Sequence, residues 1–410
     1  MTSVFNHILD YSYRYNYVHR YFLKGNTDLL DEKKKAISEY FLSDECVKDL
    51  KCLRNGELFF HPPTLKMVPK NNGKYRKTFC YNDKDSAILS FIVRSLFNIY
   101  DSVFSDNLYS SRKKLYRIDI FDNILQTTSQ AKLYSCKLDV SSYDASIDGE
   151  LLRNMIREYI DDKEMAEFLC RVTECRQYTN SGKIYEDEQA VRTGNPLAPF
   201  FENLYLTDYD KEIASYCSAY FRFCDDILFF GTKEQIDNCI IYTKDVFQKK
   251  NLHINESKFV VLSPSEPVEF LGMKINDDID IGEQLINDMK HSLIKKTRSI
   301  LSLKNKLGLS DTLAMNLMWK YEQTCYPLFQ FRIFSLITKT DGLRKIDRIM
   351  QNALRTVGSG KLLNGKYRIQ YDKLREIGYK PLVSIYYKWQ WSKKYRTKYT
   401  NNRINGCEFK

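Results

Sequence analysis

The sequence predicts an α+β protein in which a strand-containing middle lies between two helical ends. Three observations support this prediction. Residues 133–276 hold short β-rich runs separated by helical stretches. Residues 1–55 have mostly helical patterns, and apolar residues recur at helical spacing beyond about residue 280. With 410 residues, of which 43% are hydrophobic, the chain is long enough for two or three structural units.

The first two segments follow from local patterns. The N-terminal helical pattern places Leu29, Ile37, Tyr40 and Phe41 on one apolar face. Residues 69–76 combine Pro, Asn and Gly, which is typical of a turn between two strands. An apolar stretch around residues 88–100 follows, and its length and composition indicate a helix.

The C-terminal segment is expected to be helical throughout. Its first apolar face is formed by Leu285, Met289, Leu293 and Ile300. Further helices are expected near residues 311–337, 341–356 and 381–396. Lysine and arginine lie between the apolar positions, which places most of the positive charge on other faces of these helices.

The net charge of +11 is unevenly distributed along the chain. Residues 281–410 contain 26 Lys and Arg against 9 Asp and Glu, so the preceding residues carry a net negative charge. A basic C-terminal third beside a mildly acidic body is typical of a protein that binds a polyanion and also needs carboxylates. The size of the surplus favours nucleic acid over an ordinary solvated charged face.

Cysteine usage and hydropathy indicate the compartment. The eleven cysteines include no CxxC pair and no common zinc spacing, which favours a reducing, cytoplasmic setting. No run of 18 apolar residues occurs, so we expect no membrane partner.

The first candidate catalytic motif is an acidic pair inside an apolar run. Asp225 and Asp226 lie among the aromatic and aliphatic residues of 220–231, which favour strands. Presenting both carboxylates together requires a tight turn at Cys224-Asp225, because adjacent strand residues point to opposite faces. Buried acids need a partner, and a divalent cation is the natural one. Taken alone, the motif is equally compatible with an ordinary exposed Asp-Asp turn.

A second acid changes this balance. Asp139 ends another apolar strand, in the run from Lys137 to Ile147. Two-metal phosphoryl transfer requires carboxylates that converge from different strands. One ion activates the attacking 3′-hydroxyl and the other stabilises the leaving pyrophosphate. We therefore predict two Mg²⁺ ions, with Mn²⁺ as the substitute, held by Asp139, Asp225 and Asp226.

Residues 60–276 contain six motifs that, in this order, resemble those of the reverse transcriptase family, especially its bacterial and non-LTR members. The motifs are the Pro69–Arg76 hairpin, Asp139 with Ile147, Gly194-Asn195-Pro196 with Asn203, Phe223-Cys224-Asp225-Asp226, Leu252–Lys258, and Phe270-Leu271-Gly272. A weaker seventh is Tyr109-Ser110-Ser111-Arg112. Six ordered motifs are far more specific than any one of them.

The resemblance implies a right-hand polymerase fold with fingers, an antiparallel-sheet palm and a helical thumb. It implies an RNA-directed DNA polymerase that works on an RNA template and releases a DNA product. The expected division is a helical extension over residues 1–55, fingers and palm over 56–276, and a basic helical thumb over 277–410.

The resemblance also assigns roles to individual residues. Catalytic roles fall to Asp139, Asp225, Asp226 and Lys258, with Val140 joining the aspartates at the metals. Nucleotide-binding roles fall to Lys70, Arg76, Val140, Tyr143, Asp144, Gly194 and Asn203. Nucleic-acid contacts fall to Arg112, Arg222, Phe270, Leu271, Gly272, Lys295, Lys296 and Arg298. Lys258 is expected to protonate the leaving pyrophosphate, with an ordinary surface lysine as the alternative.

The sequence departs from the family pattern at three positions. Thr193 stands where the family usually has Gln, and Ala198 replaces the usual Ser. More consequential for the choice of sugar, Asp144 stands where the family has an aromatic residue that excludes a 2′-hydroxyl. The string from Asp139 to Asp144 also resembles positive-strand viral RNA polymerases, in which the second Asp and an Asn read the ribose; Asn203 is then the expected partner. Tyr143 as a gate and Asp144 as a ribose reader, or as a helix N-cap, stay open, although the other motifs favour DNA synthesis.

Within the family, the chain is most similar to the bacterial retron and abortive-infection groups. This likeness implies a dedicated structured non-coding RNA and a role in antiviral defence, and it leaves open a homo-oligomer or a second defence protein as partner. One alternative is a ribonucleotide, untemplated or protein-primed polymerase. Another, of a different class, is a catalytically silent RNA-binding scaffold.

Overall fold

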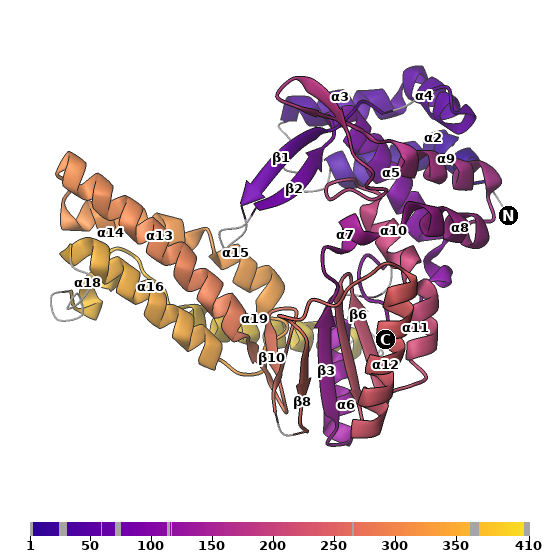
Figure 1. Ribbon diagram of the computed structural model, residues 1–410. Helices are drawn as coiled ribbons and strands as arrows, with labels where there is room; N and C mark the ends of the chain where they lie inside the picture. The colour runs from indigo at the N-terminus through magenta and orange to yellow at the C-terminus, as the bar shows by residue number, and fades with distance from the viewer. Residues whose placement is uncertain are drawn as a thin grey trace. The chain divides into compact units, whose positions relative to one another are not determined.

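The computed structural model describes residues 3–23, 31–58, 60–69, 75–112, 115, 117–264, 266–360 and 369–405. It separates into two compact units, Met1–Ile120 with Lys132–Pro264, and Phe121–Ala131 with Ser265–Lys410. Helices and three largely antiparallel sheets make up the described residues, which confirms the α+β prediction (Figure 1).

The central sheet of the first unit has the strand order β6-β7-β3-β8, and every neighbouring pair is antiparallel. Its strands are β6 (Ala219–Phe223), β7 (Asp226–Gly231), β3 (Tyr134–Asp139) and β8 (Val260–Leu262). The predicted antiparallel palm sheet is thereby confirmed. Helix α12 (Lys233–Lys249) packs against β7 and β3 and begins with a capping box between Thr232 and Gln235 (Figure 1).

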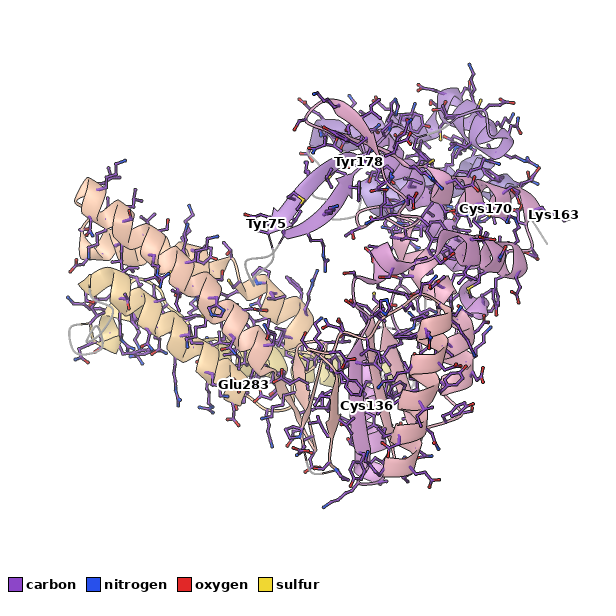
Figure 2. The ribbon with its side chains drawn as sticks, viewed as in Figure 1. Tyr75, Cys136, Lys163, Cys170, Tyr178 and Glu283 are labelled. Atoms are coloured by element: carbon purple, nitrogen blue, oxygen red, sulfur yellow. The ribbon has the colours of Figure 1, made fainter. Side chains whose placement is uncertain are left out.

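A second sheet of the first unit has the order β2-β1-β4-β5. Its strands are β1 (Thr64–Pro69), β2 (Tyr75–Cys80), β4 (Gln177–Asn180) and β5 (Lys183–Glu186). Strands β1 and β2 pair antiparallel on either side of the expected turn, whose residues 70–74 lie outside the described part. Figure 2 shows Tyr75 at the start of β2 and Tyr178 on β4.

The helices of the first unit share one hydrophobic core with the central sheet. They are α1 (Val4–Leu9), α2 (Tyr11–Val18), α3 (Asp31–Leu42), α4 (Asp44–Asn55), α5 (Asp83–Ile99), α7 (Tyr143–Ser146), α8 (Gly149–Tyr159), α9 (Lys163–Glu174), α10 (Ala198–Tyr205) and α11 (Thr207–Ile213). Ile37 and Phe41 are buried as predicted, whereas Tyr40 is half-buried and its hydroxyl donates to Asp49. Leu29 lies outside the described residues. The expected helix after the first hairpin is confirmed as α5.

The second unit includes most of α6 (Arg117–Gln130). After Ser265 it continues with a meander of β9 (Val268–Phe270), β10 (Met273–Ile275) and β11 (Ile279–Ile281). Helices follow, as predicted: α13 (Glu283–Leu307), α14 (Asp311–Gln323), α15 (Tyr326–Leu328), α16 (Asp341–Ser359), α18 (Tyr371–Glu376) and α19 (Leu382–Asn405). Met289, Leu293 and Ile300 of α13 are buried, and Ile286 rather than Leu285 completes the core face. Over the described ranges, none of the helices combines the length and apolarity needed to cross a membrane.

Candidate active site

Three aspartates meet at one end of the central sheet because of strand pairing. Strands β3 and β7 run antiparallel in a register that sets Asp139 opposite Asp226. Asp225 precedes Asp226 in the turn from β6 into β7, and its carbonyl oxygen accepts a hydrogen bond from the Val140 N–H at 3.1 Å. Residues far apart in the sequence are thereby fixed side by side.

The turn that carries Asp225 is the tight one that the sequence required. Strand β6 ends at Phe223 and β7 begins at Asp226, which leaves only Cys224 and Asp225 between them. Cys224 has φ of 55°, a left-handed conformation that few side chains other than Gly and Asn adopt readily. Both carboxylates therefore lie at the tip of a hairpin, which confirms that part of the prediction.

The surroundings of Asp225 and Asp226 disfavour their charged forms and raise their pKa values. Burial, followed by the charges of Asp226 and Asp139, raises the pKa of Asp225 to about 6. Burial is also the largest cause of the raised pKa of Asp226, to which Asp139 adds. Three crowded carboxylates destabilise one another, and a bound cation removes this repulsion.

The donor chemistry of this cluster suits a divalent cation, because Mg²⁺ and similar ions prefer carboxylate oxygen. Yet among the described residues no three acidic, histidine or cysteine side chains converge on one coordination point. The Asp139 carboxylate contacts Lys258 and Asn255. A cation bound to the same Asp139 oxygen would have to displace the Lys258 ammonium. The side chain of Val140 is a hydrocarbon, so only its backbone carbonyl oxygen could act as a ligand.

Lys258 and Asn255 form a polar bracket around Asp139. The Lys258 ammonium pairs with one Asp139 oxygen, and the Asn255 side chain donates to the other at 3.0 Å. The Asn255 N–H also donates to the Asp139 carbonyl oxygen at 2.8 Å. Burial lowers the pKa of Lys258, but the hydrogen bond and the three aspartate charges outweigh it, so the net shift is upward. Lys258 is therefore protonated beside the carboxylates.

Arg222 holds the turn that carries Asp225 through a hydrogen bond to the Cys224 carbonyl oxygen. Its guanidinium forms a fork with both oxygens of Asp210, at 2.7 and 2.6 Å, and donates to the Cys224 carbonyl oxygen at 3.0 Å. Both side chains of this ion pair are fully buried. The predicted contact of Arg222 with nucleic acid is thus wrong, because no part of the side chain reaches the surface.

Asn203 also supports this turn. Its amide donates to the Ser110 carbonyl oxygen at 3.0 Å and accepts from the Ser110 hydroxyl at 3.1 Å. The same hydroxyl oxygen accepts from the Cys224 N–H at 3.1 Å. Asn203 is 1% exposed, so its predicted partnership with Asp144 at a ribose is wrong. The residue holds the turn in place instead.

Asp144 has different partners from those expected. The Thr193 hydroxyl donates to its carboxylate at 2.5 Å, and Glu202 shares a further hydrogen bond with it. Burial, followed by the charge and hydrogen bond of Asp144, raises the pKa of Glu202 to about 9. The neighbouring Tyr143 is 4% exposed and its hydroxyl donates to the Glu202 carbonyl oxygen at 2.6 Å. Tyr143 therefore points into the core.

Gly194 lies so close to strand β2 that no side chain fits at its position. A Cβ atom there would lie 2.4 Å from the Phe79 carbonyl oxygen, and the residue has φ of +101°. The adjacent Thr193 carbonyl oxygen accepts from the Phe79 N–H at 2.8 Å, which holds the loop against the strand. This close approach gives the glycine a structural reason besides its expected closeness to a nucleotide.

Three further residues of the first unit were expected to contact a triphosphate or a nucleic acid, and they differ in exposure. Lys70 lies outside the described residues. Arg76 is exposed on β2, opposite Val68. Arg112 has a 5% exposed side chain that forms an ion pair with Asp101 at 2.8 Å, so its predicted contact with nucleic acid is wrong. It anchors the loop that leads to Ser110.

In the second unit, the turn between β9 and β10 consists of Leu271 and Gly272, with φ of 49° and 80°. Phe270 is fully buried, so it serves the core and not, as predicted, a nucleic acid. The basic residues Lys295 and Arg298 are exposed on α13, while Lys296 is half-buried with its ammonium 5.1 Å from the Tyr321 ring.

Sequence reasoning missed several contributors to the site. Asp210 gave no signal, because it is one of several acids in a polar stretch. Glu202 did give one, since it is the only charged residue of the mostly apolar helix α10. Asn255 lies in the same motif as Lys258, Leu252–Lys258, and its amide gave no separate signal there.

Comparison with known proteins adds the family context. Residues 68–275 match the family model described as reverse transcriptase (RNA-dependent DNA polymerase). The retron Ec83 reverse transcriptase of Escherichia coli is 24% identical over 179 residues, which cover 40% of this chain and 55% of that protein. The chain thus spans about half the length of this curated relative.

Two solved structures are similar at low identity. Apo telomerase from Candida tropicalis gives a TM-score of 0.44 at 13% identity, over 78% of this chain and 68% of that one. Telomerase from Candida albicans in complex with a fragment of telomeric RNA gives 0.43 at 13% identity, over 83% and 65%.

Proposed function

The chain belongs to the reverse transcriptase (RNA-dependent DNA polymerase) family, and from this premise we propose that it extends a primer with dNTPs on an RNA template. The observation that carries the proposal is the strand register that sets Asp139 against Asp226, with Asp225 beside them in the turn. Three buried or half-buried carboxylates, of which Asp225 and Asp226 have raised pKa values, suit divalent-metal phosphoryl transfer.

In this proposal, Asp139, Asp225, Asp226 and the Val140 carbonyl hold two Mg²⁺ ions. The ions would supply charge neutralisation at the attacking hydroxyl and at the leaving pyrophosphate. Lys258, protonated beside Asp139, is poised to donate its proton to the pyrophosphate once the cation displaces it. Arg76, exposed on β2, pairs with the triphosphate in a fork geometry.

The remaining parts of the proposal concern nucleic acid and organisation. Lys295 and Arg298 on α13, together with Lys296, contact template–primer phosphates in a thumb over residues 277–410. Residues 56–276 form fingers and palm, and residues 1–55 a helical extension. The turn at Leu271-Gly272 contacts the primer.

We further propose a bacterial antiviral defence role in the cytoplasm with a dedicated structured non-coding RNA as template. The likeness to a retron reverse transcriptase supports this role. The test is to sequence RNA that co-purifies with the chain expressed together with its neighbouring genes. One enriched RNA whose complement appears as DNA supports the role; a random RNA population removes it.

Primer extension by the purified chain tests the polymerase function. The wild type is given an RNA template, an annealed primer, Mg²⁺ and dNTPs, beside an Asp225→Asn and Asp226→Asn double variant. An Asp245→Asn variant, which alters an exposed carboxylate paired with Lys249, is the matched control. Product from the wild type and control but not from the double variant supports the proposal. Retained RNA binding without product from any of them would indicate the silent scaffold.

A further inference from the structure

Arg192 is a buried cation to which the proposed function assigns no role. Its side chain is 3% exposed and forms an ion pair with Asp187 at 2.8 Å. Nε donates to the same carboxylate oxygen at 3.2 Å, Nη1 donates to the Gln177 carbonyl oxygen at 2.9 Å, and Nη2 also donates to the Arg176 carbonyl oxygen. These acceptors lie at the start of β4 and just after the end of β5, so the guanidinium holds the base of the β4–β5 hairpin.

The same guanidinium also contacts two aromatic rings. Its central carbon lies 5.0 Å from the centre of the Phe79 ring and 6.0 Å from that of Tyr178, and the two rings meet edge to face at 5.5 Å. A planar guanidinium suits both the ring faces and the fork of acceptors. Phe79 belongs to β2, the strand that exposes Arg76. Arg192 therefore connects the β4–β5 hairpin to the strand that carries the proposed triphosphate ligand.

The turn that follows Arg192 contains the glycine proposed to lie next to the nucleotide. The Thr193 carbonyl oxygen accepts from the Phe79 N–H at 2.8 Å, and Gly194 is exposed with φ of +101°. The Asn195 N–H donates back to the Arg192 carbonyl oxygen at 2.9 Å. The backbone of Arg192 thus closes the turn, while its side chain attaches the turn to the hairpin and to β2.

The effect of this attachment falls on binding and not on the chemical step. Without the guanidinium, the turn has more conformations, and the free energy of ordering it is subtracted from that of nucleotide binding. The carboxylates of Asp139 and Asp226 are held by a different pair of strands, β3 and β7. A loss at Arg192 therefore weakens the bound nucleotide and the transition state equally, which raises KM and leaves kcat unchanged.

We infer that Arg192 is a positioning residue for the incoming nucleotide, which fixes the Thr193-Gly194 turn against the β4–β5 hairpin and β2 and thereby sets the KM for dNTPs. This inference rests on the polymerase function proposed above. It makes the β4–β5 hairpin part of the nucleotide site, because Asp187 at the end of the hairpin orients the guanidinium.

The test is single-nucleotide incorporation by the full chain on a primed RNA template with Mg²⁺, over a series of dNTP concentrations. Arg192→Met removes the donors at similar length and is expected to raise KM by about tenfold, with kcat within about twofold of the wild type. Arg192→Lys keeps the charge without the fork, so its KM should lie between the two. Asp187→Asn should raise KM less than Arg192→Met does, because the carbonyl acceptors of Gln177 and Arg176 remain.

Arg171→Met is the matched control for a general loss of stability. Arg171 is a partly buried arginine of α9 whose guanidinium donates to the Leu53 and Arg54 carbonyl oxygens at 3.0 and 3.3 Å. Its loss should lower the melting temperature and leave KM unchanged. An equal rise of KM in both variants, or a fall of kcat at constant KM in Arg192→Met, overturns the assignment. If Arg192→Met does not fold, the milder Asp187→Asn decides by the same criterion.

A cavity beside Arg192 permits a rescue experiment. It measures about 490 Å³ and is also lined by Tyr81, Cys175 and Glu186. Free guanidinium ion has room there to replace the missing head group of Arg192→Ala. Guanidinium chloride at non-denaturing concentrations is therefore expected to lower the KM of this variant toward that of the wild type, whereas sodium chloride at equal concentration is not. A KM that responds to both salts alike, or to neither, overturns the assignment.

Hydrogen exchange separates this inference from the function on which it rests. The Phe79 N–H, which donates to Thr193, should exchange about tenfold faster in Arg192→Met than in the wild type or Arg171→Met. If the wild type incorporates no dNTP, the polymerase function fails. The exchange rate and the calorimetric affinity for dATP with Mg²⁺ then decide the positioning role: faster exchange with weaker binding in Arg192→Met supports it, and unchanged exchange or unchanged affinity refutes it.

Discussion

Arg222 and Asp210 form a fully buried, two-pronged ion pair directly beneath the turn that carries Asp225. The same guanidinium donates to the carbonyl oxygen of Cys224, the turn residue with left-handed φ. The ion pair is therefore connected directly to the turn. Tyr220 adds its hydroxyl to Asp210 at 2.7 Å. The position of the catalytic carboxylate thus depends on a salt bridge that no substrate touches.

Removing one partner of the Arg222–Asp210 ion pair is expected to destabilise the folded protein. Arg222→Met leaves Asp210 buried without its counter-charge, which we expect to lower the free energy of unfolding by about 3–5 kcal/mol. Urea denaturation measures this loss. The matched control is Arg157→Met, which removes an exposed pair with Glu167 and should cost less than about 1 kcal/mol. Equal losses in both variants would contradict a special role for the buried pair.

Replacing both partners together separates the charge from the shape. An Arg222→Met and Asp210→Leu double variant removes the unpaired charge, so it should be more stable than Arg222→Met alone. Its dNTP incorporation should nevertheless stay low, because the Cys224 carbonyl oxygen has lost its donor. Recovery of both stability and activity would show that the turn needs no brace.

Asn203 offers a test of its corrected role. Asn203→Ala removes both side-chain hydrogen bonds between Asn203 and Ser110, and we expect a stability loss of about 1–3 kcal/mol together with slower incorporation. The ratio of dNTP to rNTP use should not change, because Asn203 does not contact Asp144. The same single-nucleotide assay measures both effects. A shifted ratio would restore the ribose-reading role that the sequence suggested.

Lys258 is expected to affect metal binding and turnover in opposite directions. Lys258→Met removes the cation that competes for Asp139, so the Mg²⁺ concentration needed for half-maximal activity should fall. Turnover should drop by about 10²-fold if the ammonium protonates pyrophosphate. Steady-state kinetics across a Mg²⁺ series resolves the two effects. Lys249→Met, at an exposed pair with Asp245, is the control that should change neither.

The sequence was sufficient to predict the candidate catalytic carboxylates, because the pattern that identifies them lies within a few neighbouring residues. Asp139 and the Asp225-Asp226 pair each end or begin an apolar strand, and acids in such places need a shared partner. The α+β division and the helical C-terminal region followed from periodicity in the same way. These features depend on short windows of the chain.

The supporting residues could not be predicted because their partners are set by tertiary packing. Arg222 carries the same charge whether it faces solvent or Asp210, and only the orientation of α11 decides between them. Phe270 and Arg112 were likewise assigned outward roles that burial excludes. Asp144 shows the same limit, since its partners Thr193 and Glu202 lie 49 and 58 residues away.

Glu322 gives the second unit a pH-dependent stability that can be tested separately from catalysis. It is fully buried on α14, and among the described residues neither of its carboxylate oxygens has a hydrogen-bond partner. Burial, and then the charge of Asp347, raises its pKa well above the ordinary value. The Asp347 carboxylate accepts hydrogen bonds from the Leu382 N–H at 2.7 Å and from the Tyr379 hydroxyl at 3.1 Å.

The sign of the pH dependence follows from this raised pKa. Below about pH 4 both the folded and the unfolded chain hold the proton on Glu322, so its titration does not change the stability there. As the pH rises further, the unfolded chain releases the proton while the folded chain keeps it. Stability therefore falls by about 1.4 kcal/mol per pH unit until the folded pKa is passed.

Glu322→Gln removes the titration at nearly constant shape. We expect its melting temperature to exceed that of the wild type by a margin that grows between pH 5 and pH 8, because only the wild type must retain a proton. Differential scanning calorimetry at several pH values measures this margin. Glu376→Gln, at an exposed position on α18, should show no growing margin. A constant difference between Glu322→Gln and the wild type would mean that Glu322 is charged in the folded protein, with a counter-charge or water beside it.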